Sequence, residues 1–265
     1  MRRFIALLPF LLLMGAFLSG QTSPEPEAAR TIRAHRLTVP VRVDGVLDEA
    51  AWLREPLTGF VQSRPDDGSP ASERTEVWVG YDNDALYIAA RLHDRSPELI
   101  DRRLGRRDDG FDSDWFIVAL DPYLDGRSGY SFAVNPAGCI RDAVLFDDEK
   151  DDSTWDGVWK SSTQVDDHGW TVEMRIPFHQ LRFRSGNVQT WGIFFQRRIR
   201  RRNEIAGLTW IPRTESGFVS RFSRLEGLSG IHPGANLELI PYSVGKAAYS
   251  PAEEGNPFSD GSHYS

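Results

Sequence analysis

The sequence predicts an all-β fold, an antiparallel, jelly-roll-like β-sandwich with few short helices. Apolar and polar residues alternate with period two in a series of short segments, and turn-forming residues separate these segments. No helical crossover lies between the predicted strands, which argues against an alternating α/β sheet. The 8 Trp and 15 Phe residues also favour extended structure, because aromatic residues are enriched in strands.

The predicted strands begin with a β-hairpin. Residues 76–81 and 85–92 both alternate, and the Asp82-Asn83-Asp84 turn joins them. Further strands are predicted at residues 115–120, 130–135, 140–146, 170–176, 191–199 and 218–225. Short helical turns are predicted at residues 48–53 and 178–181.

The stretch VDGVLDEAAW, residues 43–52, precedes the hairpin. A strand ending at Val43 is followed by a turn at Asp44-Gly45, one helical turn and Trp52. We interpret this stretch as a plug for one open end of the sandwich, in which Trp52 is a core residue and not a binding residue.

The chain begins with the pattern of a secretory signal peptide. Arg2 and Arg3 precede an apolar run of about 15 residues, which is shorter than the roughly 20 residues that a membrane span needs. We therefore expect residues 1–20 to be removed and the mature protein to be exported. Residues 21–36, which contain Pro24 and Pro26, are predicted to be a flexible leader.

The sandwich is predicted to span residues 37–229. The segment Ile231-His232-Pro233-Gly234 is typical of a linker, and residues 237–244 have the pattern of one more strand. We therefore interpret residues 230–265 as a linker and the start of a second, truncated domain.

Composition limits the partners of the protein and its means of stabilisation. Loss of Arg2 and Arg3 with the signal peptide changes the formal charge from −7 to −9, so the net negative charge disfavours binding to nucleic acid. The single cysteine, Cys139, excludes an internal disulfide. Burial of apolar side chains must therefore stabilise the domain.

Three stretches of this chain resemble the family 9 carbohydrate-binding module, a β-sandwich of the DOMON-like kind. The resemblance covers roughly residues 37–228, and it is found in VDGVLDEAAW, TEVWVGYDNDALYIAARLHD and DSDWFIVALDPYLDGRSGYSFAVNPAG. It implies binding of a carbohydrate, either a polysaccharide or its chain ends.

A closer resemblance is to exported proteins in which such a module precedes an uncharacterised domain, thought to be an outer-membrane β-barrel. The segments that resemble this subgroup are WDGVW, GWTVEMRIPFHQLRF, WGIFFQRRIRRRNE, LTWIPR and LELIPYSVGKAAY. The resemblance implies location in the periplasm or outer membrane, the protein's own downstream barrel as a partner, and a role in polysaccharide capture or breakdown.

Sugar recognition needs flat aromatic faces for the C–H side of a pyranose and fixed polar groups for its hydroxyls. In the family, two tryptophans clamp a terminal sugar; Trp210 matches the later one in position, and Phe111 stands where the earlier one is absent. Trp155 and Trp159 are candidates beside an acidic loop, with core packing as the alternative. The full set of ligand-binding candidates is Trp210, Arg107, Asp109, Phe111, Trp155, Trp159 and Glu204.

The loop before residue 115 mixes donors and acceptors. Arginine forks suit vicinal hydroxyls or uronic carboxylates, so we expect Arg107 and Trp210 to form opposite parts of one site. A solvated loop is the alternative for this segment.

Structural calcium is implied by the family resemblance. Aspartate oxygens are suitable ligands for such a hard cation. The candidates are Asp112 and Asp114 in one acidic loop, and Asp151 and Asp152 in a second, residues 147–152, whose spacing is not that of an EF-hand. No other cofactor is expected.

Residues 197–202 form the one strongly basic run. We interpret this run as a solvated strand edge, with one or two arginines paired to Glu204 or to the acidic loops.

No hydrolase, metalloprotease, phosphate-loop or cysteine-nucleophile motif occurs, and Glu173 with Glu204 is the one carboxylate pair considered for glycoside hydrolysis. We expect a non-catalytic binding domain. The alternative function is a periplasmic structural or plug domain that contacts its own barrel and binds no sugar.

Overall fold

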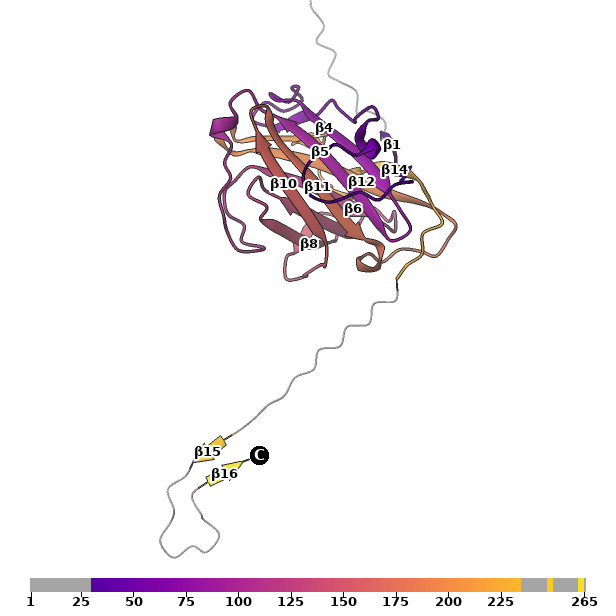
Figure 1. The fold of residues 1–265 in the computed structure, drawn as a ribbon, viewed down its shortest axis with the longest axis vertical. Coiled ribbons are helices and arrows are strands. Elements are labelled where there is room, and N and C mark those ends of the chain that lie inside the picture. The colour runs from indigo at the N-terminus through magenta and orange to yellow at the C-terminus, as the bar shows by residue number, and fades with distance from the viewer. Residues whose placement is uncertain (1–29, 235–246, 250–261, 265) are drawn as a thin grey trace, which may run out of the picture.

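The computed structural model describes residues 30–234, 247–249 and 262–264, and shows two β-sheets packed face to face (Figure 1). The predicted all-β sandwich is confirmed. The large sheet contains, in spatial order, β1 (Thr31–Arg33), β14 (Ser223–Ser229), β12 (Val188–Ile199), β6 (Trp115–Asp121), β7 (Gly129–Val134), β8 (Ile140–Phe146) and β9 (Lys150–Asp152), with β13 (Glu204–Gly207) and β3 (Val61–Arg64) added beside β12. The small sheet contains β10 (Lys160–Asp166), β11 (Gly169–Pro177), β5 (Ala85–His93), β4 (Thr75–Tyr81) and β2 (His35–Arg36).

The helical content is limited to short 3-10 turns. They are η1 (Ala50–Trp52), η2 (Pro97–Leu99), η3 (Phe178–Gln180), η4 (Arg200–Arg202) and η5 (Val219–Arg221). In the part of the chain that the structure describes, no helix has the length and apolar character needed to cross a membrane. Near the C-terminus, β15 (Ala247–Tyr249) pairs antiparallel with β16 (Ser262–Tyr264). The predicted signal peptide and the predicted strand at 237–244 lie outside the described residues.

The N-terminal strands correct the sequence-based prediction in two ways. β1 pairs with β14 and β2 pairs with β4, both in parallel, so the sheets are mixed and not purely antiparallel. These strands also lie in the predicted leader, which is therefore wrong from Thr31 onward. Buried Ala34 joins β1 in one sheet to β2 in the other. Strands of two or three residues are too short to show a period-two pattern.

The core lies between the two sheets. On β12, Trp191, Ile193 and Phe195 are all fully buried and face inward, and Phe195 stacks on Phe116 of β6 with ring centroids 6.2 Å apart. Each such side chain contributes roughly 1.5–3 kcal/mol by burial. Because successive side chains of a strand point to opposite faces, the residues between these positions lie on the outer face of the large sheet.

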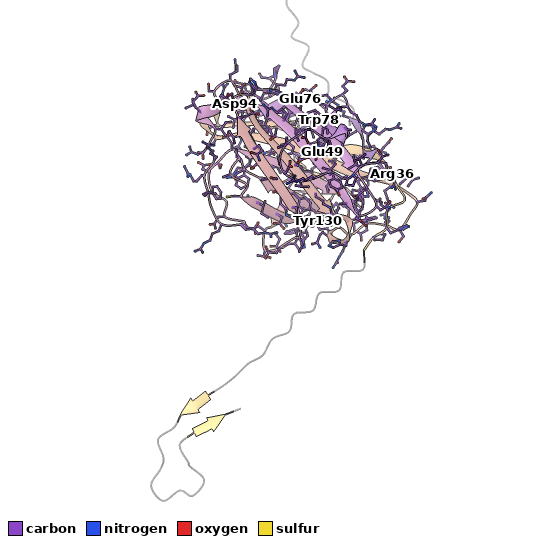
Figure 2. The ribbon with its side chains drawn as sticks, in the orientation of Figure 1. Arg36, Glu49, Glu76, Trp78, Asp94 and Tyr130 are labelled. Atoms are coloured by element: carbon purple, nitrogen blue, oxygen red, sulfur yellow. The ribbon has the colours of Figure 1, made fainter. Side chains whose placement is uncertain are left out.

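Residues 37–53 lie over the outer face of the small sheet. Trp52 is 5% exposed and packs on Tyr87 and Ala89 of β5, and Trp78 and Glu49 lie on this same side of the molecule (Figure 2). Trp52 is thus buried as predicted. The segment, however, covers a face of the small sheet and does not plug an open end of the sandwich. The outer face of this sheet is apolar like its inner face, so it has to be covered as well.

Glu173 of β11 anchors this covering segment. Its carboxylate, in a residue that is 1% exposed, accepts the backbone N–H groups of Asp44 and Gly45 at 3.0 and 2.9 Å, and the indole N–H of Trp52 at 2.9 Å. Burial raises the pKa of Glu173, and these hydrogen bonds partly oppose that shift. A carboxylate that is buried among three donors holds the covering segment against the sheet.

Candidate functional site

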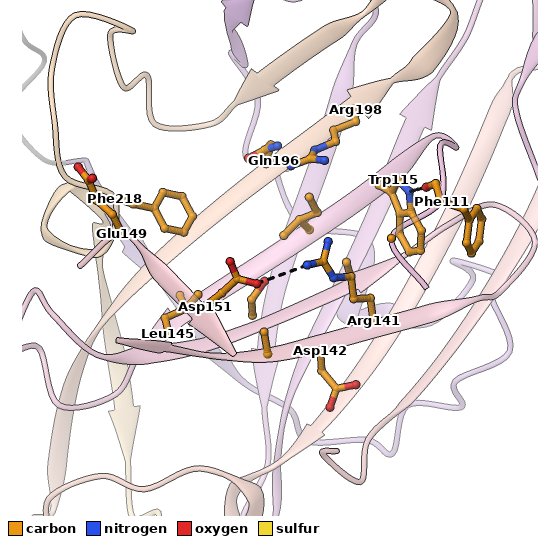
Figure 3. Close-up of a pocket in the computed structure, with 15 residues that line it drawn as sticks. Phe111, Trp115, Arg141, Asp142, Leu145, Glu149, Asp151, Gln196, Arg198 and Phe218 are labelled. Carbon is orange, nitrogen blue, oxygen red and sulfur yellow. Dashed lines mark hydrogen bonds and ion pairs between the residues drawn. The ribbon is translucent and has the colours of Figure 1, made fainter. Parts of the chain in front are cut away.

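An open cleft of about 300 Å³ lies on the outer face of the large sheet (Figure 3). Outward-facing residues of β6, β7, β8 and β12 form its floor and sides, and two loops close its ends. The cleft therefore follows from the alternation of these strands, whose other face forms the core.

The floor is hollow because Ser131, Ala133 and Ala143, all with small side chains, lie on this face. The strand register places Gln196, Ile117, Ala133 and Arg141 in one row across four neighbouring strands. In that row a long polar side chain stands at each end. Neighbouring strands are roughly 4.8 Å apart, so Gln196 and Arg141 are separated by roughly 14 Å at the backbone.

Aromatic rings form the two ends of the cleft. The ring of Trp115 lies 5.4 Å from that of Phe111, tilted by 52°, and its indole N–H donates to the Phe111 carbonyl at 3.3 Å. Phe218 and Glu149 lie at the other end (Figure 3). Phe111 and Phe218 are partly exposed, whereas Trp115 is 7% exposed and reaches the cleft with only a small part of its indole. The two phenylalanine rings can cover the apolar face of a sugar, which is the first requirement for carbohydrate recognition.

Polar forks stand along the sides. Arg141 extends from β8 and lies 3.4 Å from the Asp151 carboxylate, whereas Gln196 and Arg198 extend from β12 on the opposite side (Figure 3). Burial lowers the pKa of the Arg198 guanidinium, and the charges of Arg141 and Arg64 lower it further. These donors can serve sugar hydroxyls, which is the second requirement.

A second hollow adjoins the cleft. It has a volume of about 220 Å³ and shares Gln196 and Phe218 with the cleft. Ile205 of β13 and the loop residues Ile211 and Pro212 give it an apolar wall. The two hollows together form a groove along the outer face of the large sheet.

Two of the residues that the sequence singled out line the cleft. They are Phe111, predicted as a ligand-binding residue, and Asp151, predicted as a calcium ligand. Trp155 and Trp159 instead pack on Phe132 on the core side, with ring centroids 6.0 and 5.3 Å away, as the alternative interpretation held.

The structure separates Arg107 from Trp210, so the predicted shared site is wrong. The Arg107 guanidinium donates to the carboxylate of Asp142 on β8 at 2.6 Å and to the Gly157 carbonyl at 2.6 Å. Trp210 follows β13, on the other side of β12, β6 and β7, and its indole N–H donates to Asp67 at 2.9 Å. The prediction failed because distance along the chain does not show which strands are neighbours.

The two remaining ligand candidates also lie outside the cleft. Asp109 is exposed, and its backbone carbonyl accepts the N–H of Phe111 at 2.8 Å. Glu204 is 3% exposed and accepts the backbone N–H of Ser72 at 2.9 Å. Both positions stay predictions as ligand contacts, and the Glu204 carboxylate has an internal partner.

The four calcium candidates do not converge. Asp112 lies 3.3 Å from Arg200, Asp114 is 1% exposed, and Asp152 accepts from Thr154 at 2.7 Å. Among the described residues, no group of three or more His, Cys, Asp or Glu side chains is placed to hold a metal ion. Structural calcium remains a prediction from the family resemblance.

The basic run is not a solvated edge, which corrects the sequence interpretation. β12 lies inside the large sheet, and Arg197 is 2% exposed, donating to the carbonyl oxygens of Arg74 and His93 at 3.1 and 2.7 Å. Arg201 forms two hydrogen bonds with Asp94, at 2.8 and 2.7 Å. The arginines therefore balance buried carboxylates at one end of the sandwich.

Burial shifts the pKa values of two groups in this network, Asp114 and Arg197. Burial raises the pKa of Asp114 to about 6, although the Arg200 backbone N–H and the Arg197 charge oppose the shift. Burial lowers the pKa of Arg197 to about 10, against the charges of Asp94 and Asp114. The groups lie between the sheets and away from the cleft, so we assign them a structural role.

The carboxylate pair considered for glycoside hydrolysis is divided between the sheets. Glu173 lies on β11 of the small sheet under the covering segment, and Glu204 lies on β13 of the large sheet. Neither lines the cleft, so these two carboxylates do not face each other across it.

Sequence reasoning missed four residues of the cleft, namely Trp115, Arg141, Gln196 and Arg198. Trp115 was predicted to lie in a buried strand, which the structure confirms at 7% exposure, and Arg198 was assigned to a solvated edge. The available signal was the two-residue spacing of Gln196 and Arg198, which places both on the face opposite to the apolar residues Ile193 and Phe195 of the same strand.

No family model and no curated protein matches the chain. Among solved structures, it is similar to a family 9 carbohydrate-binding module from Caldicellulosiruptor kristjanssonii in complex with cellotriose, at 17% identity over 81% of this chain and 100% of that chain, with a TM-score of 0.54. The glucose complex of such a module from the same organism gives 17% identity, 80% and 100% coverage, and a TM-score of 0.55. A protein of inferred carbohydrate-binding function from Bacteroides uniformis ATCC 8492 gives 14% identity, 75% and 99% coverage, and a TM-score of 0.60. The chain therefore has the fold of the family 9 carbohydrate-binding modules.

Proposed function

We propose that this protein binds carbohydrate without catalysis, through the cleft on the outer face of the large sheet. The observation that carries the proposal is the combination of aromatic ends, at Phe111 and Phe218, with the polar side chains of Arg141, Gln196 and Arg198 in one open hollow. The fold supports it, because the similar modules were solved with cellotriose and glucose.

The groove formed by the cleft and its neighbouring hollow favours a chain of several sugars over a single one. Phe218 stands where the two hollows meet, so it can contact sugars on both sides. The ligand is accordingly a polysaccharide segment or an oligosaccharide.

A glycan array followed by calorimetry on the full chain tests this function. Arg141→Ala should weaken binding of the best glycan by about tenfold, because it removes a charge-assisted hydrogen bond. The matched control is Arg91→Ala, since Arg91 also extends from a sheet and pairs with an aspartate, Asp166 at 2.7 Å, but lies on the small sheet. Absence of binding to every glycan, or an equal loss in both variants, would contradict the proposal.

We further propose that the protein is exported to the periplasm or outer membrane and takes part in polysaccharide capture. The support is the signal-peptide pattern of residues 1–20 and the resemblance of the later segments to proteins with a downstream outer-membrane domain. Fractionation of cells that express the natural protein, with detection of the processed N-terminus, tests this proposal; unprocessed protein in the cytoplasm would contradict it.

The alternative function, a structural domain that contacts its own downstream domain, has one observation in its favour. Apolar side chains of the covering segment are exposed, with Leu53 at 81%, Val39 at 63% and Val46 at 45%. They lie over the small sheet, away from the cleft. This alternative would be favoured if the wild type bound no glycan and if Leu53→Ser lost the contact with the downstream domain.

A further inference from the structure

One side of the cleft has an excess of positive charge. The strand register places Arg64, Ile205, Arg198 and Trp115 in a row across β3, β13, β12 and β6. Directly paired residues share a face, so the two guanidinium groups stand on the outer face beside the Trp115 end of the cleft. The charge of Arg141, on the opposite side of the cleft, also acts on Arg198.

The carboxylates of this region are committed to other partners. Asp151 lies 3.4 Å from Arg141, and Asp142, which also lines the cleft, accepts from Arg107 at 2.6 Å. Glu149 accepts the backbone N–H of Gly217, and Asp112 lies 3.3 Å from Arg200. Among the residues that the structure describes, no carboxylate oxygen lies within 4.0 Å of the guanidinium of Arg198 or Arg64. Their charges are thus balanced only at longer range, in the case of Arg198 by Asp112.

We propose that the cleft prefers sugars that carry an anionic group, a carboxylate or a sulfate, and that Arg198 binds this group with Arg64 beside it. This inference rests on the proposed carbohydrate-binding function and specifies its ligand class. A planar guanidinium offers two parallel N–H donors, which match the oxygens of either anion. A bound anion would also relieve the repulsion between the like charges.

The position of Trp115 allows one sugar to contact the aromatic end of the cleft with its ring and Arg198 with its anionic group. It pairs directly with Arg198 across β12 and β6, so their Cβ atoms are roughly 5 Å apart. A sugar ring that packs on Phe111 and on the small exposed part of the Trp115 indole therefore brings its carboxylate or sulfate within reach of Arg198. A neutral sugar at the same place leaves the arginine charge without a partner.

The test compares matched glycans by calorimetry on the full chain. Oligogalacturonates are titrated beside their carboxyl-reduced counterparts, and sulfated galactan oligosaccharides beside their desulfated counterparts. In each series that binds, removal of the anion should weaken binding by about 10- to 100-fold. The two series distinguish a carboxylate from a sulfate as the anion.

Variants and salt supply independent readouts. Arg198→Gln should abolish the difference between a glycan and its neutral counterpart, and Arg64→Gln should reduce it. The control is Arg224→Gln, because Arg224 pairs with Gly192, six residues along β12 and thus roughly 20 Å from Arg198. In the wild type, raising the salt concentration from about 0.1 to 1 M shortens the Debye length from roughly 10 to 3 Å, so binding of the anionic glycan should weaken while that of a neutral one holds.

The outcomes separate this inference from the function on which it rests. Equal or tighter binding of the neutral glycans overturns the anionic preference and leaves carbohydrate binding intact. A difference that survives in Arg198→Gln overturns the role of this residue. Failure of the wild type to bind any glycan, anionic or neutral, overturns the proposed function itself.

Discussion

Replacing Glu173 with Gln should destabilise the protein, because Glu173 holds the covering segment on the small sheet. One carboxylate oxygen accepts the N–H groups of Asp44 and Gly45 at 3.0 and 2.9 Å, and the other accepts the indole N–H of Trp52 at 2.9 Å. A glutamine amide has only one acceptor oxygen, so its nitrogen must face at least one donor.

The magnitude follows from these contacts. A buried donor left without an acceptor costs about 1–3 kcal/mol, and loss of the charge weakens the remaining hydrogen bonds. The gain from not burying a charge partly offsets this loss, since burial raises the pKa of Glu173. We therefore expect Glu173→Gln to lower the free energy of unfolding by about 2 kcal/mol at pH 7, which corresponds to roughly 4–8 °C in melting temperature.

Urea unfolding followed by tryptophan fluorescence and circular dichroism measures this difference. Glu76→Gln is the matched control, because Glu76 also lies on the small sheet but pairs with Arg74 and His93 near the surface, at 2.6 and 2.8 Å. Its loss should cost less than about 1 kcal/mol. An unfolding free energy of Glu173→Gln within about 0.5 kcal/mol of the wild type would refute the anchoring role.

Three further predictions concern the buried network and the groove. Because burial raises the folded-state pKa of Asp114 to about 6, the stabilising contribution of this group is complete below pH 3.8 and is lost as the pH rises through 6. The free energy of unfolding, measured by chemical unfolding, should therefore change by up to about 3 kcal/mol over this range in the wild type and lose this dependence in Asp114→Asn. The same pH profile in both proteins would contradict the role of Asp114. Arg197→Met should lower the free energy of unfolding by about 3–5 kcal/mol, since it leaves the carbonyl oxygens of Arg74 and His93 without this donor and removes a buried charge 3.8 Å from Asp94, which keeps Arg201 as its partner. A loss below about 1 kcal/mol would show that these groups do not depend on Arg197. Phe218→Ala should weaken binding of a tetrasaccharide by calorimetry more than that of a disaccharide, because Phe218 joins the two hollows, and equal losses would argue for a single-sugar site.

Most of the sandwich could be predicted because its central strands alternate strongly. β4, β5 and β11 each have a buried apolar face and flanking turns, and the prediction placed all three. β10, by contrast, was missed because KSSTQVD is almost entirely polar, and it forms a strand by pairing with β11 at the edge of the small sheet. Such strands are determined by their neighbours and not by their own pattern.

The candidate site was harder to predict because it depends on which strands are adjacent. Phe111 was found through its place in a family resemblance, whereas Arg141 and Arg198 lie 57 positions apart in the chain and face one cleft only because β6 and β7 lie between their strands. Trp210 was selected for its late position, and its indole is hydrogen-bonded to Asp67. The single-sequence pattern gives the face of a residue but not its neighbour across the sheet.

The most direct test of the central claim is the chemical shift of the Trp115 indole N–H during titration of the full chain with its best glycan. The 8 Trp residues give separate indole signals, each assigned by its Trp→Phe variant. Binding in the cleft predicts a saturable shift of the Trp115 signal, with little change at Trp78 over the small sheet and at Trp210 after β13. Saturable shifts at Trp78 or Trp210 with none at Trp115 would contradict the assignment of the cleft as the binding site.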